Sequence, residues 1–594
     1  MQVASRGSEE TSGAGTSPED GPDSSVLGAR AQRLLRVAEL LAVALLLLAA
    51  LVPRARDLNG PWDRELEGFQ GACFVIGAVN FSRIGVGAYG GYPTLSVDLP
   101  GDSEALPYLY PNHPPTVPIA IWSSLKLFAP EGWDQAWQQG EAPPRGTERA
   151  ARVPFLIGHL LGLLALWWVV RLVADARVAL LALALAAALP IQILYGALVN
   201  YENFVWPLML LGVGFQLRYL KTERTRELLI AGFSFLAAAC VTFTPAFLVP
   251  SMAFAALWFR GLRCALKTGA VLSVAALVPP VLHGLWTRQV LPPELAGNLS
   301  SRLGSMLHPL FDGEHPLGEW LRRQLVRMEH FFTLPILILA AIGLVLALWR
   351  AWEGRVWAGR GSREVRGLSA GPLLLGSGCL FLMTFYRHTW DGDAARNGQT
   401  VFLLNLAPGI AILAAEALGA LGRPLLRLRG GEGPLILVTL AFLLPGLVRA
   451  EHIRQDWRDP GPLDDPSLES GPMSPLPSTA GQQIAAILPP GAVGIYPQGM
   501  ALTPACSYYA WRTVIPATKS TYDLALLRIK DAFGLGDAPR YILIPKNPPP
   551  PAVETVAETR ALVAALFERI AQTDEWELWP AFPASPAPTE DDED

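Results

Sequence analysis

The 594-residue chain has few charged residues and no cysteine pattern that would define a class of protein. Only 17% of its residues are charged, whereas 51% are hydrophobic and the mean hydropathy is +0.31. This composition argues against a typical soluble enzyme and predicts a membrane protein with several spans. The five cysteines show no C-x-x-C or other metal-binding spacing, so the sequence supports neither a disulfide framework nor a zinc site.

Nucleotide-binding motifs are also missing. The sequence contains no Walker loop and no G-x-G-x-x-G that follows a predicted strand, so nucleotide-driven transport has no motif here. The net charge is −5, and the positive charges are concentrated in particular loops. We therefore expect no nucleic-acid partner.

The hydrophobic residues that are present gather in eleven runs. Residues 1–29 are polar and cannot bury a core, so we expect a disordered segment before the first run. That first run is about as long as a bilayer requires and lacks a cleavage site, which favours a true span over a signal peptide. The runs cover residues 34–52, 153–170, 178–194, 204–220, 228–244, 246–259, 269–286, 332–349, 369–386, 400–421 and 434–449.

Basic residues alternate between the connections and thereby predict an orientation. Arg30, Arg33 and Arg36 precede the first run, and every second connection is again basic, including the loop with Arg363. The positive-inside rule then places the N-terminus in the cytoplasm, and an odd number of spans places the C-terminus outside. A composition rich in Ala, Leu, Arg, Gly and Pro favours a GC-rich bacterium, hence the plasma (inner) membrane.

This topology divides the chain into an α-helical polytopic module and a soluble tail. The helical module covers residues 30–450 and includes a first outer loop at 53–151 with juxtamembrane helices. The tail alternates helix-like and strand-like segments, which is typical of a small extracytoplasmic α/β domain. Its predicted parts are a Pro-rich linker at 451–478, the α/β domain at 479–583 and an acidic end at 584–594.

Three polar clusters of the outer face could carry chemistry. Asp63, Glu65 and Glu67 follow the first span, where a carboxylate could act as general base on a hydroxyl, although a solvated acidic loop is the alternative. "YPNHPP" sets polar residues ahead of two prolines that begin an amphipathic, interfacial helix at the level of lipid phosphates. Glu202 lies at the outer end of the fourth run, where an acid is costly enough to indicate function.

A fourth cluster lies in the outer loop before the tenth run. It contains Arg387, His388 and Arg396, whose charge-assisted hydrogen bonds could hold a phosphate. A loop that mixes both charge signs could equally be only solvated.

In order along the chain, four segments resemble the polytopic GT-C glycosyltransferases of the protein O-mannosyltransferase and aminoarabinose transferase group. The segments are "GFQGACFVIGAVNFSRIG", "YPNHPPTVPIAIWSSLKLF", "TERAARVPFLIGHLLGLL" and "PIQILYGALVNYENF". The resemblance implies a GT-C-like fold and an inverting transfer of a sugar from a polyprenyl phosphate to an acceptor hydroxyl outside the membrane. The acceptor could be a lipid, a glycan or a protein.

The resemblance also implies roles for particular residues. The base would be an acid ahead of "GFQGA", chiefly Glu67, and Glu202 would be the second carboxylate. Tyr110 and His113 fall on the positions of a tyrosine and a lysine that hold the donor phosphate, and Asn112 falls on a glutamate that can bind a divalent metal. Asn112 offers no carboxylate, so a metal held by Asn112 and Glu202 would lack a ligand that the family has.

Two other classes of function remain open at this stage. A transporter or flippase for a lipid-linked sugar would need charged or broken segments at mid-membrane depth, and the sequence has few. A non-catalytic envelope scaffold would need only the outer domain, and the asparagine at position 112 is compatible with it.

Overall fold

A computed structural model describes most of the helical part of the chain and the core of the C-terminal sheet. The chain divides into two compact units, residues 1–45 and 46–594, and the contacts reported below lie within the second. The described residues are 23–62, 65–94, 97, 113–138, 144, 146–290, 317–357, 368–385, 399–426, 432–458, 477–489, 492–497, 505–511, 513–517, 540–546, 556–557, 560–561, 564, 569–573 and 576–580.

Helices cover most of the described residues of each apolar run, with breaks at Leu189 in run 178–194, at residues 240–243 in run 228–244 and at Thr333 in run 332–349. Among the described residues, six helices are long and apolar enough to cross a membrane, which makes the chain a multi-pass membrane protein. The helices at the runs are α1 (Asp23–Ala55), α5 (Thr147–Val173), α6 (Ala176–Ala188), α7 (Pro190–Tyr195), α8 (Glu202–Thr222), α9 (Thr225–Ala239), α10 (Val249–Arg260), α11 (Leu262–Val290), α14 (Leu334–Trp357), α15 (Gly371–Thr384), η4 (Gln399–Leu406), α18 (Ala407–Leu426) and α19 (Glu432–Arg458).

Residues 225–260 form two helices rather than one. The helix α9 ends at Ala239, and a short 3-10 helix, η2 (Thr244–Leu248), contains Pro245 and leads into α10. Proline lacks the N–H that a continuing α-helix would need, so the break falls where the sequence predicts it.

Glycines allow the bundle helices to approach one another closely. A Cβ at Gly343 of α14 would lie 1.9 Å from the carbonyl oxygen of Leu413 in α18. A Cβ at Gly409 of α18 would lie 2.6 Å from the backbone nitrogen of Leu375 in α15. Because helices in lipid associate through close packing, these positions determine the spacing of α14, α15 and α18.

An ion pair joins α19 to the chain that follows α1. The Arg454 guanidinium donates to both oxygens of the Asp57 carboxylate, with an Nη2–Oδ2 distance of 3.0 Å, and both side chains are buried. Arg454 also donates to the carbonyl of Pro53. A buried pair of this kind is costly to break from one side only, because the remaining charge stays away from water.

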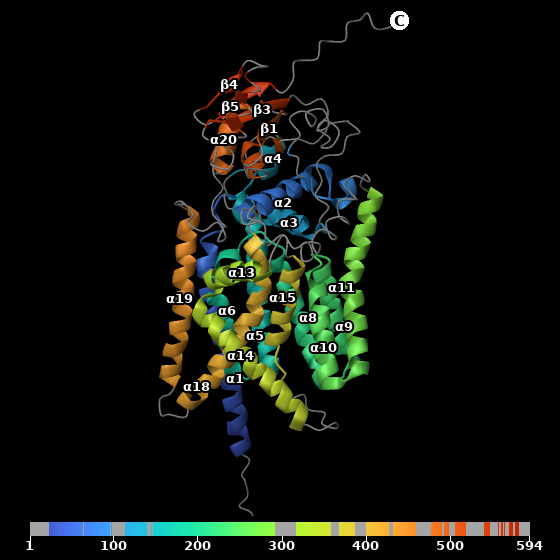
Figure 1. Cartoon of the computed structure of the whole chain (residues 1–594), viewed down its shortest axis with the longest axis vertical. Helices are drawn as coiled ribbons and strands as arrows, with labels where there is room; N and C mark the ends of the chain where they lie inside the picture. Colours follow the sequence, from blue (N-terminus) through green and yellow to red (C-terminus); the bar gives the residue numbers. More distant parts are fainter. Residues whose placement is uncertain are drawn as a thin grey trace, which may run out of the picture. The chain divides into compact units, whose positions relative to one another are not determined.

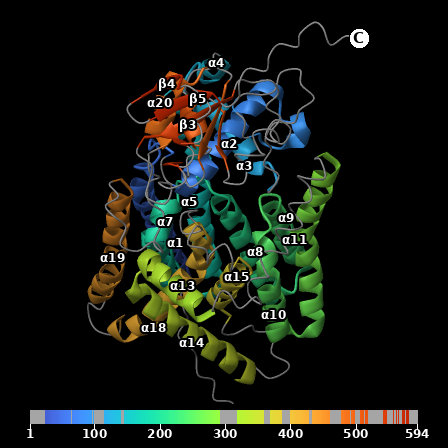
Figure 2. The ribbon, with the colours of Figure 1, turned by 45° about the horizontal axis from the view of Figure 1, so that its top comes forward.

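The predicted first outer loop is largely helical over its described residues. It contains α2 (Glu65–Ile84), η1 (Ala88–Gly91), α3 (Thr116–Phe128) and α4 (Trp133–Gln138), and α3 packs on both α2 and α5. Residues 71–81 of α2 are all buried, which explains why this helix is apolar although it does not belong to one of the predicted spans. In Figure 1 and in the turned view of Figure 2, α2 and α3 lie between the bundle and the C-terminal sheet.

The C-terminal part contains a five-stranded mixed sheet. Its strand order is β2-β1-β3-β5-β4, with β1 parallel to β2 and β3, and β5 antiparallel to β3 and β4. Two helices, α20 and α21, pack against each other beside it, and α21 also contacts α2. The bounds are α20 (Pro477–Ile487), β1 (Val493–Pro497), α21 (Ala505–Ala510), β2 (Thr513–Ala517), β3 (Arg540–Pro545), β4 (Ala571–Gln572) and β5 (Trp576–Pro580).

Candidate active site

The first-loop acids lie at the beginning of α2. Glu65 is the first residue of this helix and Glu67 follows within its first turn, where a carboxylate interacts favourably with the positive end of the helix dipole. Asp63 lies outside the described residues, as do the side chains of Glu65 and Glu67. Their assignment as candidate bases therefore stays a prediction.

His113 precedes α3 and packs between two aromatic rings from other parts of the chain. Its ring lies 4.0 Å from that of Tyr201, tilted by 37°, and 5.8 Å from that of Phe243, nearly parallel to it. Burial lowers the pKa of His113 to about 3, and the nearby His283 adds to the effect. The ring is therefore neutral at pH 7 when no anion is bound, whereas the donor-phosphate hypothesis treats it as a cation.

Tyr201 contacts His113 and directly precedes Glu202, the second predicted carboxylate. The Tyr201 ring also meets Phe74 of α2 at 5.3 Å, edge to face, and Glu202 is the next residue. Phe74, His113 and Tyr201, from distant parts of the sequence, thus meet at the N-terminal end of α8. Of the sequence-predicted site residues, this convergence brings together His113 and the neighbour of Glu202.

Glu202 begins α8, ahead of the apolar run 204–220, and is 7% exposed. Burial raises the pKa of its carboxyl to about 7. A carboxyl that titrates near neutral pH in a polar cluster is a candidate for proton transfer, although structural burial alone can produce the same shift.

Two asparagines hold the backbone that leads to Glu202. The side-chain amides of Asn200 and Asn203 both donate to the carbonyls of Tyr195 and Leu198, over 2.9–3.1 Å. The side-chain oxygen of Asn200 accepts from the backbone N–H of Asn203 at 2.9 Å, and that of Asn203 lies 3.2 Å from Nδ1 of His159. The segment 195–203 is therefore rigidly held.

The sequence reasoning missed several residues of this region. His283 of α11 meets the ring of Tyr92, which follows α2, at 5.6 Å, and the Tyr92 hydroxyl lies 2.6 Å from that of Thr287. A histidine inside an apolar run is a signal that could have pointed to α11. Tyr201 and Phe243 gave no such signal, because aromatic residues are common at membrane boundaries.

The remaining predicted phosphate ligands lie outside the described residues. They are Tyr110, Arg387, His388 and Arg396, and the predicted metal ligand Asn112 also lies outside the described residues.

The described residues do not offer a donor set for a metal ion. In this part of the chain, no group of three His, Cys, Asp or Glu side chains is close enough together to hold one. Glu202 brings a single carboxylate, and Asn112, the other residue predicted to hold a metal, lies outside the described residues.

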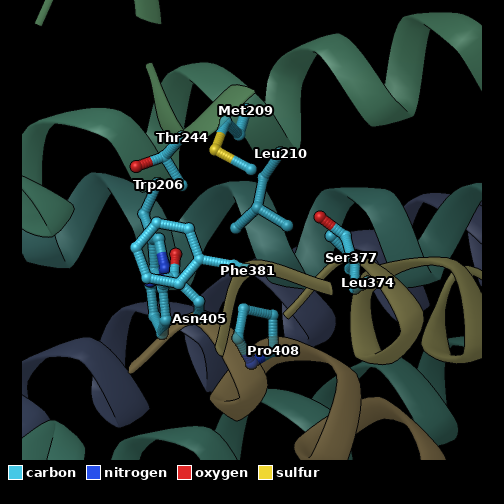
Figure 3. A pocket seen from close by; sticks show the side chains of 9 residues that line it. All are labelled: Trp206, Met209, Leu210, Thr244, Leu374, Ser377, Phe381, Asn405 and Pro408. Atoms are coloured by element: carbon cyan, nitrogen blue, oxygen red, sulfur yellow. The ribbon is translucent and has the colours of Figure 1, made fainter. Parts of the chain in front are cut away.

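A small cavity lies within the bundle near Phe243, the ring that stacks on His113. Its lining is mostly apolar, with Thr244, Ser377 and Asn405 as the polar exceptions (Figure 3). The volume that the centre of a water molecule can reach is about 10 Å³, enough for roughly one water. The lining residues are Trp206, Met209, Leu210, Thr244, Leu374, Ser377, Phe381, Asn405 and Pro408.

Several solved structures of membrane glycosyltransferases are similar to this chain at low identity. ArnT from Cupriavidus metallidurans bound to undecaprenyl phosphate is 15% identical, with a TM-score of 0.48, over 92% of this chain and 99% of that one. The apo oligosaccharyltransferase of Archaeoglobus fulgidus is 12% identical, with a TM-score of 0.49, over 85% and 69%. The AglB protein of the same organism, in complex with an inhibitory peptide and a dolichol-phosphate, is 12% identical, with a TM-score of 0.47 and the same coverage.

No curated protein matches the sequence. The family comparison gives one match, to the dolichyl-phosphate-mannose-protein mannosyltransferase family, over residues 145–286. This segment contains Glu202, Phe243 and His283. The predicted resemblance is thus confirmed: over residues 145–286 the chain carries the sequence pattern of the dolichyl-phosphate-mannose-protein mannosyltransferases, membrane glycosyltransferases that use sugars linked to lipid phosphate.

Proposed function

We propose that the protein transfers a sugar from a polyprenyl-phosphate donor to an acceptor hydroxyl on the outer face of the membrane, with inversion at the anomeric carbon. We also propose that the chain crosses the membrane about eleven times in a GT-C-like arrangement. The observation that carries it is that His113 and Phe74 of α2 both contact the ring of Tyr201, the residue before Glu202, while α2 is the helix that begins with the first-loop acids.

The reaction needs a base on one side of the anomeric carbon and a site for the leaving phosphate on the other. Glu67 takes the proton from the acceptor hydroxyl while the oxygen of that hydroxyl bonds to the anomeric carbon. The bond from that carbon to the phosphate oxygen breaks, and its electron pair leaves with the polyprenyl phosphate. Attack from the face opposite the phosphate inverts the configuration, and a positioned base commonly contributes about 10²–10⁴-fold.

His113 and Tyr110 are assigned to the phosphate. The pKa of about 3 means that His113 carries no charge before the donor binds. A phosphate beside the ring favours the imidazolium, because an opposite charge nearby raises the pKa of a histidine. The donor would therefore bind together with a proton, and the neutral ring of the empty site avoids a buried charge.

The test uses purified protein in nanodiscs with a panel of radiolabelled polyprenyl-phosphate sugars. Wild type should transfer at least one sugar, and Glu67→Gln should lower kcat by about 10²–10⁴-fold. Glu131→Gln, an exposed acid in the same loop, is the matched control and should retain wild-type turnover. Tight donor binding by wild type with no transfer to any acceptor would instead support the scaffold.

The orientation has a separate test. A phosphatase fused after residue 594 should be active, because the C-terminus is predicted to lie outside, and one fused after Arg363 should be silent. The opposite pattern would place the convergence at His113 on the cytoplasmic face and contradict the proposal.

A further inference from the structure

The side chain of Trp62 is completely buried at the junction of three distant segments. In the sequence, Trp62 lies between the end of α1 and the acids at 63–67. One neighbour comes from α5 and the others come from α21 of the C-terminal part.

Arg152 of α5 holds the chain that precedes Trp62. Its buried guanidinium donates to the carbonyls of Leu58, Gly60 and Pro61, with distances of 2.9 Å to Leu58 and 3.3 Å to Pro61. The same group lies 4.1 Å from the centre of the Trp62 ring, a cation–π contact. One cation therefore holds several successive residues in place as well as the tryptophan.

Helix α21 also contacts Trp62, through Tyr508 and Tyr509. The backbone N–H of Trp62 donates to the Tyr509 hydroxyl at 2.7 Å, across 447 residues of sequence. The Tyr508 ring meets the Trp62 ring edge to face at 6.2 Å and meets Tyr509 at 5.0 Å. The same short helix packs on α2, so it contacts both the residue before the acids and the helix that carries them.

We infer that Tyr509 of α21 and Arg152 of α5 are positioning residues that hold the first-loop acid against the acceptor. This inference rests on the proposed function. Chemistry of this kind tolerates little error, since a displacement of about 1 Å can cost about 10²-fold in rate. Glu65 and Glu67 follow Trp62 by three and five residues, so freeing the backbone N–H of Trp62 loosens the chain that leads to these carboxylates.

The experiment compares Tyr509→Phe with Tyr541→Phe in the full-length protein in nanodiscs. Tyr509→Phe removes the hydroxyl oxygen that accepts the hydrogen bond from the Trp62 backbone N–H, and it keeps the aromatic ring. Tyr541, in β3 of the C-terminal sheet, allows the same Tyr→Phe change at a position with no contact to Trp62 among those described. We expect Tyr509→Phe to lower kcat by about tenfold or more with the donor Kd unchanged, and Tyr541→Phe to keep both.

A measurement without turnover separates this inference from the proposed function. Hydrogen–deuterium exchange of a peptide covering residues 58–67 should be faster in Tyr509→Phe than in wild type and unchanged in Tyr541→Phe. If only general stability were lost, exchange would rise throughout the sheet and donor binding would weaken in proportion, which would overturn the inference. Equal kcat and equal exchange in the two variants would also overturn the inference. An inactive wild type with the expected exchange would contradict only the proposed function.

Discussion

Replacing His113 by phenylalanine tests how the donor phosphate is held. The phenyl ring can keep the stacking against Tyr201 and Phe243 and cannot take up a proton. His113→Lys supplies the opposite comparison, a cation that does not titrate near neutral pH. If the phosphate binds the imidazolium, donor affinity in wild type depends on pH and in both variants it does not.

The size of the effect follows from the pKa of the empty site. Since that pKa is about 3, the free protein holds no proton on His113 above roughly pH 5, and the bound protein must acquire one. Below the pKa of the bound state, each unit of pH then changes the donor Kd about tenfold, or about 1.4 kcal/mol. Affinity falls as pH rises and levels off above that bound-state pKa.

Isothermal titration calorimetry between pH 5 and pH 8 measures both the Kd and the protons taken up, if buffers of different ionisation enthalpy are compared. We expect uptake to approach one proton per donor at low pH in wild type and to vanish in His113→Phe. His283→Gln is the control for the neighbouring histidine, because its charge also affects His113. A wild-type Kd that does not vary with pH, or the same slope in His113→Phe, would refute the reasoning.

Three further predictions concern stability, measured by thermal unfolding in detergent. Arg454→Ala removes the guanidinium that donates to the buried Asp57 carboxylate, so we expect a loss of about 3–5 kcal/mol, with Asp57→Ala completing a double-mutant cycle. Gly343→Ala would place a Cβ 1.9 Å from the Leu413 oxygen and should cost about 1–3 kcal/mol; an unchanged melting temperature would contradict the tight packing. Burial holds the pKa of Glu202 at about 7, above its ordinary value of 4.5, so stability should fall as pH rises from 4.5 to 7. Glu202→Gln should remove this fall, which is at most about 3 kcal/mol.

The sequence by itself determined which stretches are helical in the bundle. Length and apolarity are local properties, so the eleven runs could be read directly, and Pro245 marked the break between α9 and α10. The same local signals predicted a helix after the proline pair that follows His113 and a small mixture of helices and strands at the C-terminal end. The beginning of α2 lay three residues earlier than "GFQGA", which places Glu65 and Glu67 inside the helix rather than ahead of it.

Only the tertiary structure decided which side chains meet. The rings of Tyr201 and Phe243 and the imidazole of His283 reach His113 from segments more than 80 residues away. Tyr509 reaches Trp62 across 447 residues. No periodicity or motif specifies such pairs, because they depend on how the helices pack and not on local backbone preference. Packing also affects the pKa of His113, which stands where the family has a lysine: burial, together with the nearby His283, lowers that pKa.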